Sequence, residues 1–485
     1  MKRLFALAAC ALTLAACQDQ AGPVGAAPET NASTLLGLSP AVSIDPTLRT
    51  LLNLSAPTEK LEVFVTYDES VTNTQNVASA LTASGAGIIK FRNLPIVFAL
   101  ATPAQITSIT TQPGVISVYS NKQLQYFLAE SNRAIRSPEA WAAGYTGKGV
   151  GIAILDSGID GLYNAGLAYP AKTVHNVKYA VAMRDLVTFD PSEPAPGGEL
   201  FVANVPNSET SVGHGTHVAG IAAGNGSNST NGFYKGVAPD ANLIGIGAGD
   251  ILFVFWTLAG MDYILDIREQ YNIQVVNNSW GSEGVYDPAD PINVASKKLY
   301  DAGVAVVFAA GNAGPDENTL NPYSAAPWVI SVAAGCNYGV SIDPTNGAPQ
   351  CGDGRSGILA DFSSRGINGD PLVHPDITAP GVNIVSTRAA LGAVLNGLDA
   401  PADALDCNIS LQHVAYYTCA GGTSMAAPHV AGTIALMEEA AKGRLTPAQA
   451  YSAIVRTAKP LPGYAQWEVG AGFLDAYAAA RYVRR

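Results

Sequence analysis

The sequence predicts an α/β protein with a mostly parallel sheet and helices on both of its faces, preceded by a small ferredoxin-like α+β domain. Two patterns in the 485 residues support this prediction. From residue 133 onward, short apolar runs that end in polar or glycine-rich loops alternate with helical stretches, which is typical of a parallel sheet with crossover helices. Over residues 58–130, strand and helix signals follow in the order β-α-β-β-α-β, which is that of a ferredoxin-like unit.

The chain begins with MKRLFALAACALTLAAC, which has a basic start, a short apolar run and a small-residue end. The apolar run is too short to span a bilayer, so residues 1–16 are expected to form an export signal. The end of this stretch resembles the lipobox of bacterial lipoproteins, and this resemblance implies a lipid on Cys17. An ordinary signal peptide cut nearby remains the alternative. Residues 17–57 are rich in Ala, Pro, Ser, Thr and Asn without clear periodicity, and we expect a flexible tether.

The small domain is expected over residues 58–130. KLEVFVTYD alternates apolar and polar residues and predicts a strand, NVASALTASG predicts a short helix, and GIIKFRNLPIVFALA predicts two strands. The following helix has Thr102 as its cap, Pro103 at its first position and Gln105 to close a capping box. VISVYSNKQLQYF predicts the last strand. No catalytic cluster is evident in this domain.

The large domain is expected over residues 133–485. Its strands are predicted in VGIAILDSGID, ANLIGIGAG, QVVNNSWG, GVAVVFAAGNAG and WVISVAA, and helices are expected at 213–224, 252–270 and 291–302. A further stretch, GGTSMAAPHVAG, predicts a helix of small residues, thin enough to be buried, with Ser424 at its start. Ligand sites in parallel sheets gather at the carboxyl ends of the strands, so polar residues there are candidates for function.

Composition excludes one class of function and predicts disulfides. Charged residues make up 14% of the chain and the net charge is −12, whereas nucleic-acid binding requires basic patches. Beyond the signal region the chain contains an even number of cysteines, as expected for an exported protein with disulfides, and their spacing does not resemble a zinc site. Of the three pairings, the local one is favoured because each pair brackets a Gly-, Pro- or polar-rich loop: Cys336–Cys351 and Cys407–Cys419.

Four polar residues at predicted strand ends or helix starts form a catalytic combination. Taken singly, Asp156 and Asn312 are ordinary turn residues, Ser424 is an ordinary helix cap, and His214 could pair with His217 on a metal. The metal pair is disfavoured because HGTH lacks the glutamate and the spacing of the HExxH pattern. Together the four supply a nucleophilic serine, an imidazole base, a carboxylate that orients the base, and an amide that stabilises an oxyanion.

The blocks ILDSGID, HGTHVAG, NNSWG, AAGNAG, PDITAPG and GTSMAAPHVAG resemble the signature motifs of the subtilisin-like serine peptidases, or subtilases, over roughly residues 145–480. The resemblance implies that Asp156 is the triad acid, His214 the general base and Ser424 the nucleophile, in the chain order known for subtilisin. It also implies that Asn312 is the oxyanion donor together with the backbone N–H of Ser424.

The same resemblance implies a substrate-binding edge strand at Ser279, Trp280 and Gly281, to which an extended peptide would add. It implies that Ala310 and Gly311 line the primary specificity pocket, whose small apolar walls favour apolar or aromatic side chains. Trp280 departs from the more usual leucine and is expected to narrow a neighbouring pocket.

By resemblance, residues 58–130 are a propeptide that assists folding, inhibits the enzyme and is cut somewhere in 126–134. The expected function is that of an exported serine endopeptidase, self-processed from a proenzyme and either lipid-anchored to the bacterial envelope or released. Its partners are protein or peptide substrates and its own propeptide; no nucleic acid is expected, and a membrane only through the N-terminal lipid. No cofactor is needed for the chemistry, no metal ligands are named, and a structural calcium would have ligands that the sequence does not identify. The alternative is a catalytically silent binding lipoprotein with the subtilase fold.

Overall fold

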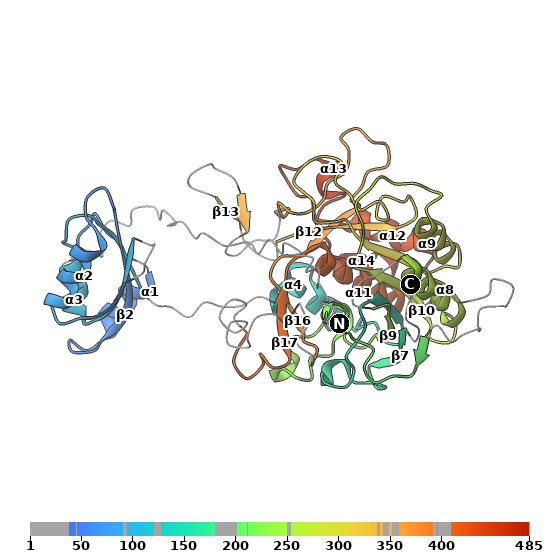
Figure 1. The fold of residues 1–485 in the computed structure, drawn as a ribbon, viewed down its shortest axis with the longest axis horizontal. Helices are drawn as coiled ribbons and strands as arrows, with labels where there is room; N and C mark the ends of the chain where they lie inside the picture. The colour runs from blue at the N-terminus through green and yellow to red at the C-terminus, as the bar shows by residue number, and fades with distance from the viewer. Residues whose placement is uncertain are drawn as a thin grey trace, which may run out of the picture. The chain divides into compact units, whose positions relative to one another are not determined.

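The computed structural model describes residues 38–44, 46–90, 95–120, 128–179, 201–210, 212–249, 254–336, 340–342, 349–351, 358–390, 395 and 409–484. The chain divides into two compact units, residues 1–124 and 125–485 (Figure 1). The expected signal segment 1–16 and Cys17 lie outside the described residues. None of the described helices is long and apolar enough to cross a membrane.

The first unit has the predicted β-α-β-β-α-β order. Its sheet is five-stranded, in the order β1-β5-β2-β4-β3, with β1 parallel to β5 and the other neighbours antiparallel. The predicted capping box of α3 is present, because Thr102 Oγ1 accepts from the backbone N–H of Gln105 at 3.4 Å and Gln105 Oε1 accepts from that of Thr102 at 2.8 Å. The elements are β1 (Ser43–Ile44), α1 (Pro46–Leu54), β2 (Leu61–Tyr67), α2 (Thr74–Ala83), β3 (Gly87–Lys90), β4 (Ile96–Ala101), α3 (Pro103–Ile109) and β5 (Val115–Ser120).

The prediction of a flexible tether over residues 17–57 is wrong for the last part of this range. Residues 43–54 form β1 and α1, and Ile44, Leu48 and Leu52 are buried in the core of the first unit. Leu48 and Leu52 are four residues apart, which places them on one face of α1, where they pack against the sheet. Leu51 packs against the same core, but the apolar pattern covers only about one helical turn and was therefore missed in the sequence.

The second unit is built on an eight-stranded sheet in the order β15-β12-β11-β10-β6-β9-β7-β8. All neighbouring strands are parallel except β7 and β8, so the predicted mostly parallel α/β sheet is confirmed. The strands are β6 (Gly151–Asp156), β7 (Thr173–Tyr179), β8 (Phe201–Ala203), β9 (Asn242–Gly247), β10 (Ile273–Asn278), β11 (Ala305–Ala309), β12 (Ile330–Gly335) and β15 (Ile377–Pro380).

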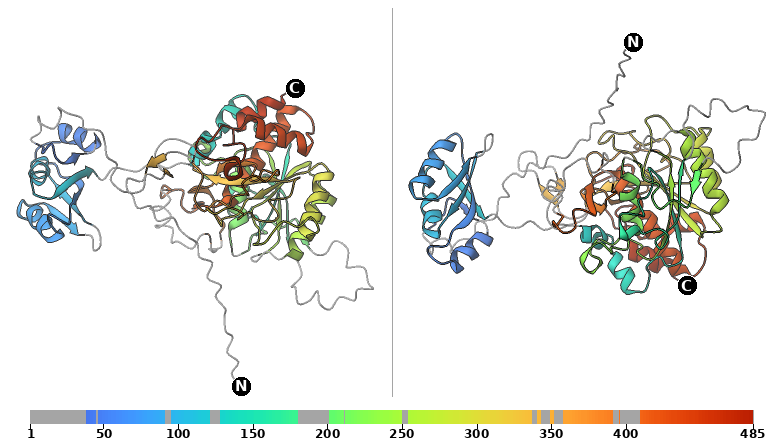
Figure 2. Two further views of the ribbon diagram at one scale, coloured as in Figure 1. Left: turned by 90° about the horizontal axis from the view of Figure 1, so that it is seen from above. Right: turned by 60° about the horizontal axis from the view of Figure 1, so that its bottom comes forward.

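Helices cover both faces of this sheet (Figure 2). Side chains of β6 alternate between two hydrophobic cores: Ile152 and Ile154 join one core with α7, α11 and α14, and Leu155 joins the other with α8 and α9. Strands buried on both faces are apolar throughout, which explains the continuous apolar runs in the sequence. The helices are α4 (Leu128–Ala134), α5 (Ser137–Ala142), α7 (His214–Ala223), α8 (Val254–Ile267), α9 (Pro291–Asp301), α11 (Thr423–Ala441), α12 (Pro447–Thr457), α13 (Gln466–Val469) and α14 (Ala476–Val483). Short elements complete the unit: the 3-10 turns η2 (Ala165–Leu167) and η3 (Thr230–Gly232), and the hairpins β13 (Val340–Ile342) with β14 (Pro349–Cys351) and β16 (Ile384–Thr387) with β17 (Tyr417–Ala420).

The helix α11 is almost entirely buried and packs against the strands at the centre of the sheet. Its small residues are required for this position. A Cβ on Gly432 would lie 2.6 Å from the Cβ of Val237 and 2.7 Å from the carbonyl oxygen of Ala222. The predicted thin, buried helix is therefore present, and its first turn begins beside the ends of the central strands.

Candidate functional site

The candidate residues lie at the carboxyl edge of the sheet. Asp156 is the last residue of β6, His214 is the first residue of α7, and Asn312 follows the end of β11. Ser424 is the second residue of α11, and Ser279 comes directly after β10. Because β6, β10 and β11 are parallel neighbours, their carboxyl ends meet at one edge, where sites in such sheets form.

Asp156 and His214 form a hydrogen-bonded pair. Asp156 Oδ1 accepts from His214 Nδ1 at 2.8 Å and from the backbone N–H of Ser157 at 2.7 Å. Asp156 is 1% exposed, whereas the imidazole of His214 is 22% exposed. Burial alone would lower the pKa of His214, but the charge of Asp156 and its hydrogen bond, together with the charge of Glu209, raise that pKa above its usual value. The pair therefore has a fixed tautomer, a stabilised imidazolium and an outer face that solvent reaches.

Ser424 and Ser279 are linked by two reciprocal hydrogen bonds. Ser424 Oγ donates to the carbonyl oxygen of Ser279 at 2.8 Å, and Ser279 Oγ donates to the carbonyl oxygen of Ser424 at 2.7 Å. This places the nucleophile candidate against the expected substrate-binding strand. The start of α11 also supplies the positive end of a helix dipole beside the hydroxyl of Ser424. Gly422 allows this approach, because its φ of 151° lies in a region that other residues rarely adopt.

The side chain of Asn312 is held at the start of the same helix. Asn312 Oδ1 accepts from the backbone N–H of Thr423 and from Thr423 Oγ1, both at 2.9 Å. Thr423 Oγ1 in turn accepts from the backbone N–H of Gly311 at 3.1 Å. With its oxygen engaged in this way, the amide presents its N–H₂ group outward, and Asn312 is exposed to solvent. The orientation suits a donor to a developing oxyanion.

The two expected walls of the substrate site are joined by Asn321, which sequence reasoning missed. Its Nδ2 donates to the carbonyl oxygen of Trp280 at 3.0 Å and to the carbonyl oxygen of Ala309 at 3.1 Å. Its backbone N–H donates to the carbonyl oxygen of Ala310 at 2.7 Å. A Cβ on Gly281 would lie 2.3 Å from this amide group, so Gly281 is needed for the approach. The asparagine thus connects the strand end after β10 with that after β11.

Trp280 is anchored by its own contacts. Its indole N–H donates to the carbonyl oxygen of Leu155 at 2.8 Å, and its ring packs edge-on against Phe308 and Tyr323. The indole is therefore fixed beside the end of β6. Narrowing of a neighbouring substrate pocket by this ring stays a prediction.

A second buried carboxylate, that of Glu209, lies next to the Asp156–His214 pair and was also missed in the sequence. Glu209 Oε2 accepts from the backbone N–H of Thr216 at 2.9 Å and from Thr216 Oγ1 at 2.6 Å. Burial raises the pKa of Glu209, whereas hydrogen bonds from Thr216 and Ser157 lower it and the charge of Asp156 raises it further. Its signal was available, since an acidic residue near a helix start is favourable, but Glu209 lies four residues before Gly213 in a polar stretch without other signals.

His217 does not form a metal pair with His214. His217 Nε2 lies 3.2 Å from the carbonyl oxygen of Thr418, and burial lowers the pKa of this imidazole to about 3. Within the described ranges, no group of three or more His, Cys, Asp or Glu side chains could hold a metal ion. The cysteine pairing stays a prediction, because Cys407 and the side chain of Cys351 lie outside the described residues.

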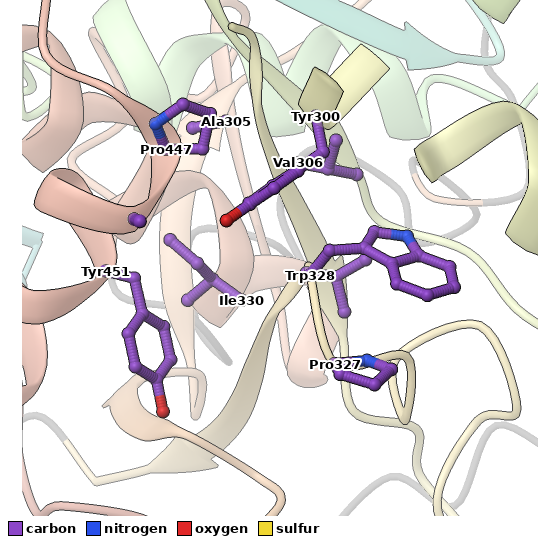
Figure 3. A pocket seen from close by; sticks show the side chains of 10 residues that line it. Tyr300, Ala305, Val306, Pro327, Trp328, Ile330, Pro447 and Tyr451 are labelled. Carbon is purple, nitrogen blue, oxygen red and sulfur yellow. The ribbon is translucent and has the colours of Figure 1, made fainter. Parts of the chain in front are cut away.

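A small cavity of about 80 Å³ lies at the opposite edge of the sheet (Figure 3). Ala305 and Ile330, which line it, are the first residues of β11 and β12. Aromatic rings of Tyr300, Trp328 and Tyr451 surround the space. It is too small and too far along the strands to belong to the site at their carboxyl ends.

Comparisons with known proteins identify the family of the second unit. The model of the "Subtilase family" matches residues 147–473. The "Serine protease AprX" of Bacillus subtilis is 29% identical over 403 residues, covering 78% of this chain and 78% of that protein. The "Extracellular basic protease" of Dichelobacter nodosus is 29% identical over 384 residues, 75% of this chain and 55% of that protein. The crystal structure of fervidolysin from Fervidobacterium pennivorans, titled a keratinolytic enzyme related to subtilisin, superimposes with a TM-score of 0.51 at 19% identity, covering 91% of this chain and 63% of that one.

Proposed function

The chain belongs to the subtilase family and is a serine endopeptidase, and we propose that Asp156, His214 and Ser424 form its catalytic triad, with Asn312 as the oxyanion donor. The observation that carries this assignment is the 2.8 Å hydrogen bond between Asp156 Oδ1 and His214 Nδ1, two residues that are 58 positions apart in the chain. A buried carboxylate that fixes the imidazole of a solvent-facing histidine is the acid–base half of a serine peptidase site.

In the proposed mechanism, the Ser424 hydroxyl turns from the carbonyl oxygen of Ser279 toward His214 Nε2 and gives up its proton as Oγ attacks the scissile carbonyl carbon. The tetrahedral oxyanion accepts hydrogen bonds from Asn312 Nδ2 and the backbone N–H of Ser424. As the C–N bond breaks, the imidazolium gives its proton to the leaving amine, and an acyl group remains on Ser424. Water then attacks the ester by the same sequence, with His214 as base, and releases the carboxylic acid.

We expect the substrate to bind as an extended strand beside Ser279, Trp280 and Gly281. The amide of Asn321 is engaged at both ends, since Nδ2 donates to two carbonyl oxygens and Oδ1 accepts from the backbone N–H of Tyr323 at 3.2 Å. Because Asn321 is also buried, it presents little polar surface to a substrate. Together with the small residue Ala310, this supports a preference for apolar or aromatic side chains at the residue before the scissile bond.

We infer that the first unit is the propeptide. Its sheet leaves a row of apolar side chains outside its own core: Phe64 pairs with Phe98 across the strands, their ring centroids are 5.3 Å apart, and Ile89, next in the row, is 61% exposed. An exposed apolar face on a small unit is typical of a surface that binds another protein. Its expected roles are inhibition and assistance in folding until self-cleavage.

Relatives of the chain include extracellular proteases, which supports an exported enzyme. The proposal also includes lipid attachment at Cys17, the two local disulfides and retention at the envelope. These three features are proposed from the sequence.

Active-site labelling tests the assignment. A phosphonofluoridate serine probe should label Ser424 in the processed protein, and mass spectrometry of the labelled peptide identifies the position. The Ser424→Ala variant, made without other proteases, should take up no probe and accumulate as uncut precursor. Folded protein that neither labels nor cleaves a denatured protein substrate would instead indicate a silent binding protein with the subtilase fold.

A further inference from the structure

The start of α7 is fixed by a side chain from outside the helix. Gly213, at the cap position, has no side chain to accept the first N–H groups, and its φ is 75°. Glu209 fulfils this function by accepting from the backbone N–H and the hydroxyl of Thr216, while its Oε1 accepts from the backbone N–H of Thr210 at 3.0 Å. Since His214 is the first residue of α7, the orientation of this turn also sets the position of the imidazole.

The same carboxylate is connected to the end of β6. The hydroxyl of Ser157 hydrogen-bonds to Glu209 and accepts from the backbone N–H of Gly215 at 2.8 Å. The backbone N–H of Ser157 donates to Asp156 Oδ1. Glu209 therefore joins the two elements that carry Asp156 and His214, through Ser157, which follows Asp156, and Thr216, two residues after His214.

The hydrogen bonds around Glu209 favour its ionised form and oppose the effect of burial, which raises the pKa of this carboxyl. Thr216 Oγ1 accepts from the backbone N–H of Asp160 at 3.0 Å, so its own hydrogen is free to point at Glu209. The backbone N–H groups of Thr210 and Thr216 can only donate. A carboxylate, which is an acceptor only, matches this set of donors. Glu209 is 4% exposed, so its charge lies in a poorly screened environment.

We propose that Glu209 is a positioning residue for the general base: it holds the start of α7 against the end of β6 and adds a second negative charge behind the imidazolium of His214. This proposal rests on the triad assignment. In the transition state His214 becomes positively charged, and a buried carboxylate nearby stabilises that charge in addition to Asp156.

Other charged groups near His214 act in different directions. Asp156, from β6, raises the pKa of His214, as does Glu209. His217, on the same helix, remains neutral because burial lowers its pKa, and its interaction with His429 of α11 lowers it as well. Lys178, from β7, donates to the backbone carbonyl oxygen of Glu209 at 3.1 Å and not to its carboxylate. The charge of Glu209 is therefore not cancelled by that lysine.

The test compares Glu209→Gln and Glu209→Ala with the wild type and with Glu139→Gln, a matched control that removes an exposed carboxylate from the first turn of α5. Each processed enzyme is titrated with the serine probe, so that kcat is expressed per competent site, and kcat/KM is measured from pH 5 to 9. We expect Glu209→Gln to move the acid limb of the profile to lower pH and Glu209→Ala to reduce kcat about 10- to 100-fold, the order expected for a misplaced catalytic group, with KM nearly unchanged. Glu139→Gln should leave both unchanged.

A purely structural role for Glu209 would lower the melting temperature and the number of competent sites, but leave kcat per site and the acid limb as in the wild type. That result would overturn the proposal. If Glu209→Ala does not fold, Glu209→Gln alone decides, because it keeps the shape of the side chain and removes the charge. A wild-type enzyme that takes up no probe would contradict the triad assignment instead, so the two failures are distinguishable.

Discussion

Replacing Asp156 by asparagine isolates the charge of the proposed triad acid. Asp156 Oδ1 accepts two hydrogen bonds, whereas Oδ2 is buried and has no hydrogen-bond partner among the described residues. An asparagine therefore fits with its oxygen in the place of Oδ1 and its N–H₂ group in the place of Oδ2. In this orientation His214 keeps its tautomer, and the substitution removes the negative charge with little change of shape.

The magnitude follows from the separation of the two charges. The hydrogen-bonded atoms are 2.8 Å apart, and spreading the charge over the carboxylate and the imidazolium gives an effective separation of about 4 Å. At an effective dielectric constant of about 20, the attraction is about 4 kcal/mol. If that stabilisation of the imidazolium is lost in the transition state, kcat/KM falls by about 10³.

The acid limb of the pH–rate profile should move at the same time. Below the pKa of His214 the imidazole carries a proton and cannot accept the one from Ser424, so the activity is lost as the pH falls through that pKa. The Asp156 carboxylate raises this pKa, so Asp156→Asn should shift the limb to lower pH. Peptide hydrolysis is measured from pH 5 to 9 against Asp301→Asn, which removes an exposed carboxylate on α9. A loss below tenfold, or an unmoved acid limb, would refute the reasoning.

Three further outcomes are expected. Asn312→Ala should lower kcat with little effect on KM, by about 10²–10³, a magnitude taken from subtilisin, where the oxyanion asparagine shows it; an unchanged kcat would exclude Asn312 as the donor. N-terminal sequencing should place the processing site before Ser131, since Ser131 and Asn132 are buried and Asn132 Nδ2 donates to the carbonyl oxygen of Lys235 at 2.8 Å; a mature chain starting later would contradict this. Burial lowers the pKa of His217 to about 3 and of His429 to about 4, so below pH 6.5 unfolding takes up protons. In the Ser424→Ala variant, these two histidines should therefore lower the free energy of unfolding by about 2 kcal/mol per pH unit between pH 6 and 4, partly offset by Glu438, whose pKa burial raises to about 7. Equal denaturation midpoints at pH 6 and pH 4 would refute this expectation.

The sequence predicted the parallel sheet because its strands are buried on both faces. Runs such as that of β6 are apolar throughout and end in a polar residue, Asp156, so both the strand and its carboxyl end were evident. The helices expected at 213–224, 252–270 and 291–302 correspond to α7, α8 and α9 within a few residues. Glycine bounds the first of these stretches at both ends, and the third begins at Pro291 and is followed by Gly303; glycine and proline are the residues that end or begin a helix most clearly.

The parts that the sequence did not predict depend on contacts between distant segments. Glu209 lies in a polar loop, and only the fold shows that its carboxylate reaches the first turn of α7. Asn321 is an ordinary turn residue in the sequence, and its role appears only when its amide bridges the carbonyl oxygens of Trp280 and Ala309. The helix α1 was missed for another reason, since its apolar residues Leu48, Leu51 and Leu52 span only about one turn, which is a short periodic signal.

The arrangement of α11 explains how the site can be fixed while its proposed nucleophile stays able to move. The helix is buried on nearly all sides, so the core of the second unit determines where its first N–H groups point. Asn312 is tied to the same turn through Thr423, and the two expected oxyanion donors are therefore set by one rigid element. Within this frame, the side chain of Ser424 needs only a rotation about its Cα–Cβ bond to leave the carbonyl oxygen of Ser279. Because such a rotation is fast and the donors do not have to move, little reorganisation is required when the substrate arrives.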